Sequence, residues 1–259
     1  MNHTPARSGW EWVKQGFGML KKQPAGLSTL FFGYMLLSTL LLVVPLAGQI
    51  AHYVLMPVFA IGFMTAAREI GAGKPVMPGL LVAGFRGPSL RKLCVLGVIH
   101  LLVFLAAGAI GVLLFADTEA LRNATPAELQ TNPQLLLDSG LVPTMATTAL
   151  LYIPALLVIS FAAPLVHWNG MGPGKALFYS FFAIKRAAGA FFMFAVSLFA
   201  ITIVVLLLVR ALFGFDTMGL ALMRMLSEVL YGVAHCALYM AYVHIFPPAQ
   251  AAADPFTKS

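Results

Sequence analysis

The residues that could do chemistry are concentrated in the last long apolar segment of the chain, residues 218–246. Ionisable groups at membrane depth often line solute or proton paths, but polar contacts between helices are also a common packing device. At about 100° per residue, six side chains fall on one face of a helix. We call this set the polar stripe: Arg224, Glu228, Tyr231, His235, Tyr239 and Tyr242. Because Arg224 and Glu228 are four residues apart, we expect them to pair.

Two histidines are candidates for holding a cofactor. We expect His100, in the third apolar segment, to lie at a similar depth to His235. Two imidazoles on facing helices are what axial haem ligation requires, and with Glu228 they could bind a divalent metal. A lone histidine on a helix is more typical of a hydrogen-bonded packing residue. We therefore predict no cofactor and no metal, and keep a haem- or quinone-binding protein as an alternative.

No known catalytic motif accompanies these residues. The sequence contains no G-x-S-x-G, P-loop or H-E-x-x-H pattern, and no His/Asp arrangement accompanies Ser160 or Ser197. Cys94 and Cys236 both lie in apolar segments and have no CxxC spacing. The sequence therefore predicts a protein without enzymatic activity.

Membrane-spanning helices must position the polar stripe. The 259-residue chain is 60% hydrophobic and 10% charged, with a mean hydropathy of +0.90, whereas soluble proteins have about 25% charged residues. This composition predicts an all-α polytopic protein with a single integral membrane domain. Exposing Arg224 to lipid at the bilayer centre would cost about 2.5–3.5 kcal/mol, so we expect the other spans to cover the stripe. The predicted spans are residues 27–46, 50–70, 93–115, 142–166, 189–213 and 218–246.

The basic residues flank the apolar segments. A net charge of +7 would suit nucleic acid in a soluble protein, but here the positive charges act as topology signals, and we exclude nucleic acid as a partner. The positive-inside rule predicts cytoplasmic termini. It also predicts that the acidic segment 116–141 is a periplasmic loop. Residues 1–23 lack a continuous apolar core, so we expect them to be retained rather than cleaved as a signal peptide.

Residues 8–23 predict an amphipathic helix in the plane of the membrane surface, with tryptophans at the headgroup level. The alternative is a helix that packs on the protein's own cytoplasmic face, because both positions require the same amphipathicity. The basic, aromatic segments before the spans predict contacts with anionic headgroups. The residues expected to make them are Trp10, Trp12, Lys14, Lys21, Lys22, Arg91, Lys92, Lys185 and Arg186.

A weak repeat extends this pattern along the chain. An apolar residue, a two-residue gap, a small residue and Phe recur, each time before a basic pair and two spans. We therefore expect six transmembrane helices as three hairpins, each preceded by a cytoplasmic amphipathic in-plane helix. The copies are Val13 with Gly16-Phe17, Leu81 with Gly84-Phe85, and Leu177 with Ser180-Phe181.

Several of these segments resemble a known family. Gly9-Trp10, Trp12, Gly16-Phe17, Lys21-Lys22 and Pro24 are similar to the opening of an uncharacterised family of six-span inner-membrane proteins of proteobacteria, as are residues 78–86 and 175–186. More distantly, the chain resembles the membrane domain attached to some glycerophosphodiester phosphodiesterases, without their catalytic domain. The resemblance implies a bacterial inner-membrane location and no defined activity.

Together these features favour a non-enzymatic membrane component that binds lipid or a partner protein. The expected partners are anionic lipid headgroups, with a membrane protein or a second copy of the chain as further candidates. One alternative is a small transporter or channel that uses the polar stripe on the sixth span. The other is the haem- or quinone-binding protein.

Overall fold

The computed structural model describes residues 4–117, 139–214 and 216–246, and this part of the chain is helical without any strand. Six of its helices, α2, α3, α4, α8, α10 and α11, are long and apolar enough to cross a membrane. The predicted all-α polytopic architecture is confirmed, while most of segment 116–141 lies outside the described residues. In chain order the elements are α1 (Arg7–Lys22), α2 (Pro24–Leu42), α3 (Ala47–Gly71), η1 (Pro78–Phe85), α4 (Leu90–Phe115), α8 (Leu141–Trp168), α9 (Pro173–Arg186), α10 (Ala188–Phe213) and α11 (Thr217–Ile245).

The first span differs most from its predicted boundaries. It was expected over residues 27–46, whereas α2 runs from Pro24 to Leu42. Proline is tolerated in the first helical turn, where its missing N–H would have no intrahelical partner. Gln23 has a non-helical backbone conformation, with φ −139° and ψ 68°, and separates α1 from α2. The span therefore begins immediately after the amphipathic helix.

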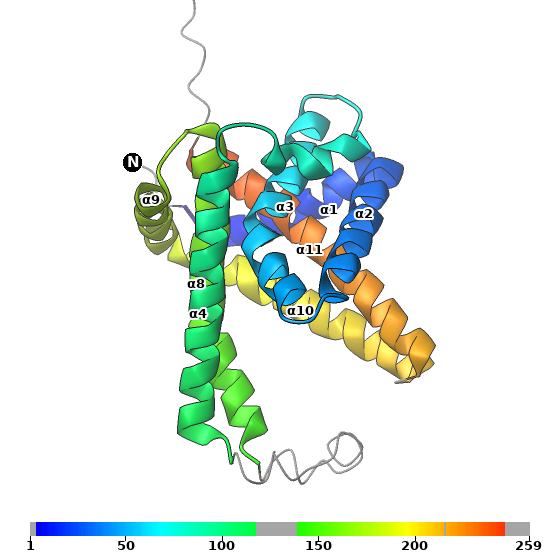
Figure 1. The fold of residues 1–259 in the computed structure, drawn as a ribbon. Helices are drawn as coiled ribbons and strands as arrows, with labels where there is room; N and C mark the ends of the chain where they lie inside the picture. The colour runs from blue at the N-terminus through cyan, green and yellow to red at the C-terminus, as the bar shows by residue number, and fades with distance from the viewer. Residues whose placement is uncertain (1–3, 118–138, 215, 247–259) are drawn as a thin grey trace, which may run out of the picture.

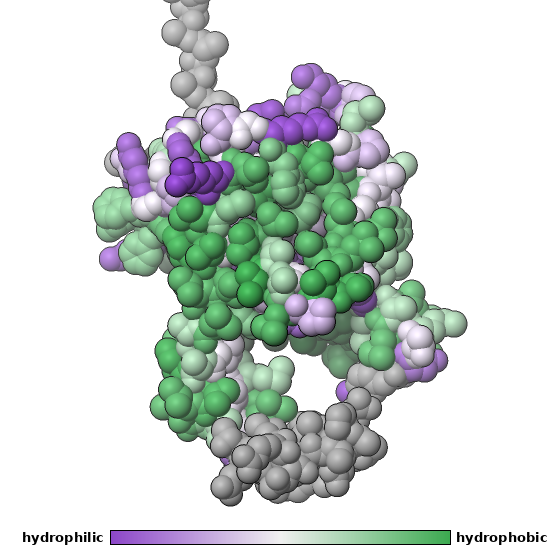
Figure 2. Space-filling view, viewed as in Figure 1, coloured by the Kyte–Doolittle hydropathy of each residue, from purple (hydrophilic) through white to green (hydrophobic). Residues whose placement is uncertain are grey.

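The bundle has two distinct ends (Figure 1). α1, η1 and α9 lie toward one end, which we call the basic end, and the turn between α10 and α11 lies toward the other, which we call the far end. Figure 2 shows hydrophilic residues gathered at the basic end above a broad hydrophobic band. This distribution is typical of a protein embedded in a membrane.

Each of the three short helices packs against a different hairpin of spans. η1 contacts the α2–α3 hairpin that precedes it, and α9 contacts the α4–α8 hairpin that precedes it. α1 has no preceding hairpin and packs instead against the last one, between α10 and α11. The N-terminal helix therefore closes a ring of three hairpins. The second helices of the hairpins, α3, α8 and α11, contact one another at its centre.

The small residue of each repeat lies at these contacts. A Cβ atom added at Gly84 or Gly16 would collide with a backbone carbonyl of the neighbouring span, and the hydroxyl of Ser180 donates to the corresponding carbonyl at 2.6 Å. Small residues allow helices to approach this closely. The paired residues are Gly84 with Val58, Ser180 with Val158, and Gly16 with Val233. The repeated pattern thus marks one packing interaction used three times.

The apolar face of α1 packs against the bundle while its polar face is exposed, and the prediction that Trp12 contacts lipid headgroups is wrong. Trp12 is 1% exposed, its Nε1 donates to His244 Nδ1 at 3.1 Å, and its ring centroid lies 5.3 Å from that of Phe191. The close approach of Gly9 to Ala190 draws the apolar side of α1 into the bundle. The middle copy also differs from expectation, because η1 is an eight-residue 3-10 helix.

Candidate functional site

The polar stripe is only partly covered by the other spans. Glu228 and His235 are 9% and 6% exposed, but the Arg224 side chain is 43% exposed. The expectation of full cover is therefore wrong at Arg224. Toward the far end, α10 and α11 extend beyond the tip of the α2–α3 hairpin (Figure 1). This part of α11 therefore has fewer neighbouring helices to cover it.

At the far end of the stripe, Arg224 joins two helices. Its Nη2 lies 2.7 Å from Glu228 Oε1 in the pair expected from their spacing. The same nitrogen donates to the hydroxyl of Ser38 in α2 at 2.9 Å, and Ser38 is fully buried. The pair reduces the cost of burying the Glu228 carboxylate and also connects α11 to α2.

In the middle of the stripe, aromatic rings pack in a row. Tyr231 stacks on Tyr34 of α2, with ring centroids 4.9 Å apart and an angle of 9° between the ring planes. The ring centroid of His235 lies 4.3 Å from that of Tyr231. His235 Nδ1 is 2.9 Å from the carbonyl oxygen of Tyr231. A carbonyl only accepts, so Nδ1 carries the proton, and in the neutral ring Nε2 is a hydrogen-bond acceptor.

At the basic end, the stripe packs against the end of α8. Trp168 lies 5.7 Å from Tyr239 and 5.3 Å from Tyr242 between ring centroids. The Tyr242 hydroxyl donates to Asn169 Oδ1 at 2.7 Å, and the Arg68 guanidinium lies 5.3 Å from the Trp168 ring centroid. This part of the stripe is therefore a packing surface.

A cavity of about 230 Å³ lies beside the middle of the stripe, between α3, α4, α8, α10 and α11. His100 and His235 both line it, as expected from their similar depth. His100 Nε2 is hydrogen-bonded with the Tyr152 hydroxyl, and its Nδ1 is 3.4 Å from the carbonyl oxygen of Tyr53. Haem ligation by both histidines would require His100 to give up its bond with Tyr152. Within residues 4–117, 139–214 and 216–246, no three His, Cys, Asp or Glu side chains are grouped to hold a metal ion.

Sequence reasoning missed the roles of three further side chains. Tyr34 stacks on Tyr231 and Tyr152 bonds with His100; both come from other helices, and nothing in their local sequence distinguishes them. Ser160, which no catalytic motif accompanies, lines the cavity. It follows Val158 by two residues, as His235 follows Val233, a relation that only the contacts of Ser180 and Gly16 with these valines reveal.

The predicted headgroup contacts differ in their surroundings. Lys14 is paired with Glu11 at 2.7 Å, and Lys92 donates to the carbonyl of Gly170 at 2.8 Å. Trp10 is 43% exposed. Lys21, Lys22, Arg91, Lys185 and Arg186 are exposed.

Lys185 and Arg186 border a groove of about 940 Å³ at the basic end. It runs between α9 and the end of α11, and aromatic and basic side chains share its lining. Such a groove suits an anionic headgroup that carries apolar chains. The side chains relevant here are Tyr179, Phe182, Lys185, Arg186, His244 and Phe246.

One comparison with known proteins is informative. The chain is 31% identical over 243 residues to a protein named "Probable inner membrane protein" from Burkholderia thailandensis, covering 92% of this chain and 90% of that protein. No family model matches the chain. No solved structure matches it either.

Proposed function

Since the chain belongs to the family of the Burkholderia thailandensis probable inner membrane protein, we propose that it is a non-enzymatic inner-membrane component that binds anionic phospholipid at its basic end. The observation that carries this proposal is the groove beside α9, where Lys185 and Arg186 adjoin aromatic side chains. A groove at one end of six membrane-compatible helices is at a suitable position for a lipid headgroup, which supports the proposal.

The orientation of the basic end supports an anionic partner. By the positive-inside rule, the end that carries α1, η1 and α9 faces the cytoplasm. Anionic lipids give a membrane surface a negative potential, and each nearby Lys or Arg gains about 1 kcal/mol from it. A basic pair at this position therefore favours phosphatidylglycerol or cardiolipin over a zwitterionic lipid.

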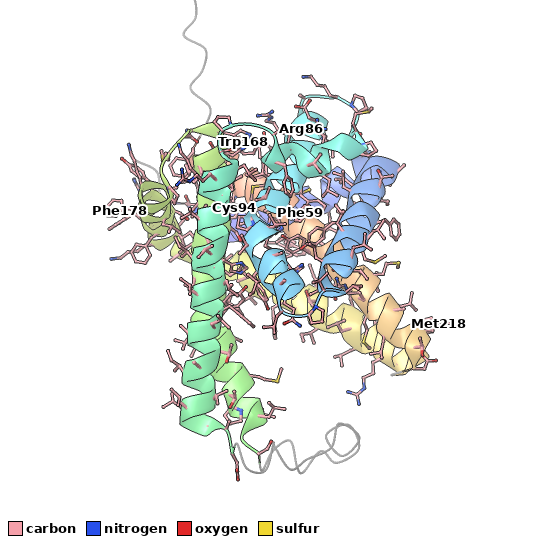
Figure 3. The ribbon with its side chains drawn as sticks, in the orientation of Figure 1. Phe59, Arg86, Cys94, Trp168, Phe178 and Met218 are labelled. Atoms are coloured by element: carbon pink, nitrogen blue, oxygen red, sulfur yellow. The ribbon has the colours of Figure 1, made fainter. Side chains whose placement is uncertain are left out.

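α9 has the exposed surface of an interfacial helix. Phe178 is 61% exposed and points away from the bundle (Figure 3), and Phe181 and Phe182 are 50% and 48% exposed. Lys175 lies 5.9 Å from the Tyr179 ring centroid. Aromatic and basic side chains on one exposed helix suit the boundary between headgroups and acyl chains. The interfacial role expected of residues 8–23 is thus better suited to α9.

The groove offers separate contacts for each part of a phospholipid. The Arg186 guanidinium can bind two phosphate oxygens at once, and Lys185 adds a compact positive charge. Phe182 and Phe246, on the two sides of the groove, provide apolar surface for the start of an acyl chain. The distant resemblance to the membrane domain of some glycerophosphodiester phosphodiesterases agrees with a lipid-related role and remains a hypothesis.

The test compares two charge-matched variants of the purified full-length protein. Lys185→Gln/Arg186→Gln removes the basic pair at the groove, and Lys21→Gln/Lys22→Gln removes an exposed pair at the end of α1. Affinity is measured with phosphatidylglycerol and phosphatidylcholine in mixed micelles. We expect wild type to prefer phosphatidylglycerol, and the groove variant to bind it about thirtyfold more weakly, as loss of about 2 kcal/mol implies.

Lys21 and Lys22 were also expected to contact headgroups, but they lie outside the groove lining, so the control variant should retain most of the wild-type preference. Equal affinity of wild type for both lipids, or equal losses in the two variants, would contradict a specific groove. If another membrane protein instead co-purifies equally with wild type and both variants, the partner-binding hypothesis would be favoured.

A small transporter or channel is the second candidate function. The observation that favours it is the position of the buried Glu228 and His235 on the central helix α11, with His235 at the wall of the cavity. Ionisable groups at such a position are typical of solute and proton paths.

A further inference from the structure

The central cavity lies where equivalent positions of the three hairpins converge. The residues two positions after Val58, Val158 and Val233 are Ala60, Ser160 and His235, and all three line the cavity. The residues two positions before the same valines, Met56, Leu156 and Tyr231, line it as well. The repeat therefore builds one shared chamber, and its copies differ in whether they contribute an apolar or a polar side chain.

Two polar groups of this chamber are available to a ligand. His235 Nδ1 is used by the carbonyl of Tyr231, so Nε2 is an acceptor that no other described residue satisfies. Ser160 forms no hydrogen bond with a described residue, and its hydroxyl can donate or accept. A ligand that fits both groups carries a hydroxyl, which donates to His235 Nε2 and accepts from the hydroxyl of Ser160.

Apart from His100, which is bonded with Tyr152, and Tyr231, the rest of the lining is apolar. Leu157, Ala195, Leu198 and Leu238 contribute aliphatic surface. A volume of about 230 Å³ is below the range of about 300–1,000 Å³ typical of sites that enclose a whole drug-sized ligand. The chamber therefore suits the head of a longer molecule, with the remainder outside.

The chamber has an opening on the side of α8. Ile153 lines the cavity and is also 41% exposed. α8 and α10 diverge from this level toward the far end (Figure 1), and Figure 2 shows open space between the arm formed by α4 and α8 and the arm formed by α10 and α11. An apolar tail can leave the chamber through this opening into the acyl chains.

We propose that the central cavity binds the hydroxyl-bearing head of a lipid-soluble compound, either a quinol or an isoprenoid alcohol, with its tail passing Ile153 into the bilayer. His235 Nε2 accepts the ligand hydroxyl, and Ser160 provides the second polar contact. The site is separate from the phospholipid groove beside α9, so each can be tested without the other.

Matched ligands test the hydroxyl contact. Decylubiquinol, kept reduced under anaerobic conditions, is titrated into the purified protein in detergent beside its dimethyl ether, and farnesol beside its methyl ether. These ethers partition into micelles similarly but carry no hydroxyl and cannot donate a hydrogen bond. We expect the hydroxyl form of at least one compound to bind about tenfold more tightly than its ether. The ether leaves His235 Nε2 buried without a donor, and a buried unpaired polar group weakens binding by about this factor. Binding of the quinol alone, or of the alcohol alone, identifies the source of the ligand.

Matched variants test the location. His235→Phe removes the acceptor, and we expect it to bind the hydroxyl form no better than the ether. Ile153→Trp fills the opening and should abolish binding. Its control is Leu150→Trp, on the same helix at a position that is 75% exposed and outside the cavity lining. This control should bind like wild type, which shows that loss of binding in Ile153→Trp comes from the filled opening and not from a tryptophan on α8. An ether affinity equal to that of wild type shows that His235→Phe is folded.

Three results would overturn the proposal. They are equal affinity for hydroxyl and ether forms, no saturable binding of either compound class, and unchanged affinity in Ile153→Trp.

Discussion

The hydroxyl of Ser180 donates a 2.6 Å hydrogen bond to the backbone carbonyl oxygen of Val158. This bond holds α9 against α8, and Gly16 likewise allows α1 to approach the carbonyl of Val233 in α11 closely. The second contact joins the two ends of the chain. The stability of the whole ring should therefore depend on how tightly α1 fits between α10 and α11.

A larger side chain at Gly16 should open the ring. A Cβ atom there would lie 2.9 Å from both Val233 O and Ala237 Cβ, so Gly16→Val should destabilise the protein by about 1–3 kcal/mol through overpacking. Thermal unfolding of the purified protein measures the loss. Gly18→Val is the control, because nothing lies within 4 Å of an added Cβ at Gly18. Equal melting temperatures for the two variants would show that α1 is not held at this contact.

The two tryptophans of α1 should respond differently to substitution. Trp12→Phe loses the hydrogen bond to His244 and should cost about 1 kcal/mol. Trp10→Phe, at a position that is 43% exposed, should change stability little. Denaturant titration of both variants checks this expectation. Identical unfolding midpoints would be inconsistent with a buried Trp12.

Removing Arg224 alone should be worse than removing its charge together with that of Glu228. Arg224→Met leaves the Glu228 carboxylate buried without its 2.7 Å partner, at a cost of about 1–3 kcal/mol. The partial exposure of Arg224 places the effect toward the lower end of that range. Arg224→Met/Glu228→Gln should recover part of the loss, since no unpaired charge remains. A double-mutant cycle in melting temperature measures the coupling, and additive effects would mean that the pair contributes nothing.

The transport candidate makes a prediction about proton flux. In proteoliposomes that contain a pH-sensitive dye, Glu228→Gln should abolish proton flux, because it removes the titratable carboxylate of the buried stripe. Glu11→Gln, at a surface pair whose carboxylate is half exposed, should leave it unchanged. Equal flux through wild type and Glu228→Gln would end the transport reading.

Cysteine labelling tests the predicted orientation. Met77 precedes η1 at the basic end and Met218 is the second residue of α11 at the far end, and they are similarly exposed at 61% and 59%. In a background without Cys94 and Cys236, a membrane-impermeant thiol reagent applied to spheroplasts should label Met218→Cys. It should label Met77→Cys only after the membrane is broken. The reverse pattern would invert the topology.

The sequence by itself determined the spans and the composition of the stripe. An apolar helix must be long enough to cross the hydrocarbon layer, so hydropathy and length located six helices. Helical periodicity likewise placed Glu228 and His235 on one face, because that relationship is local. The repeat also located the contact residues Gly16, Gly84 and Ser180, although not the helices that they touch.

Only the tertiary structure decided the rest. Amphipathicity is the same for a helix on a membrane and for one that packs its apolar face against two other helices. The sequence therefore could not tell that the apolar face of α1 is buried and that the aromatic side chains of α9 are exposed. The cavity depends on distances between side chains far apart in the chain, such as Ser160 and His235. Local sequence carries no record of those distances, because they are set by how closely the three hairpins pack.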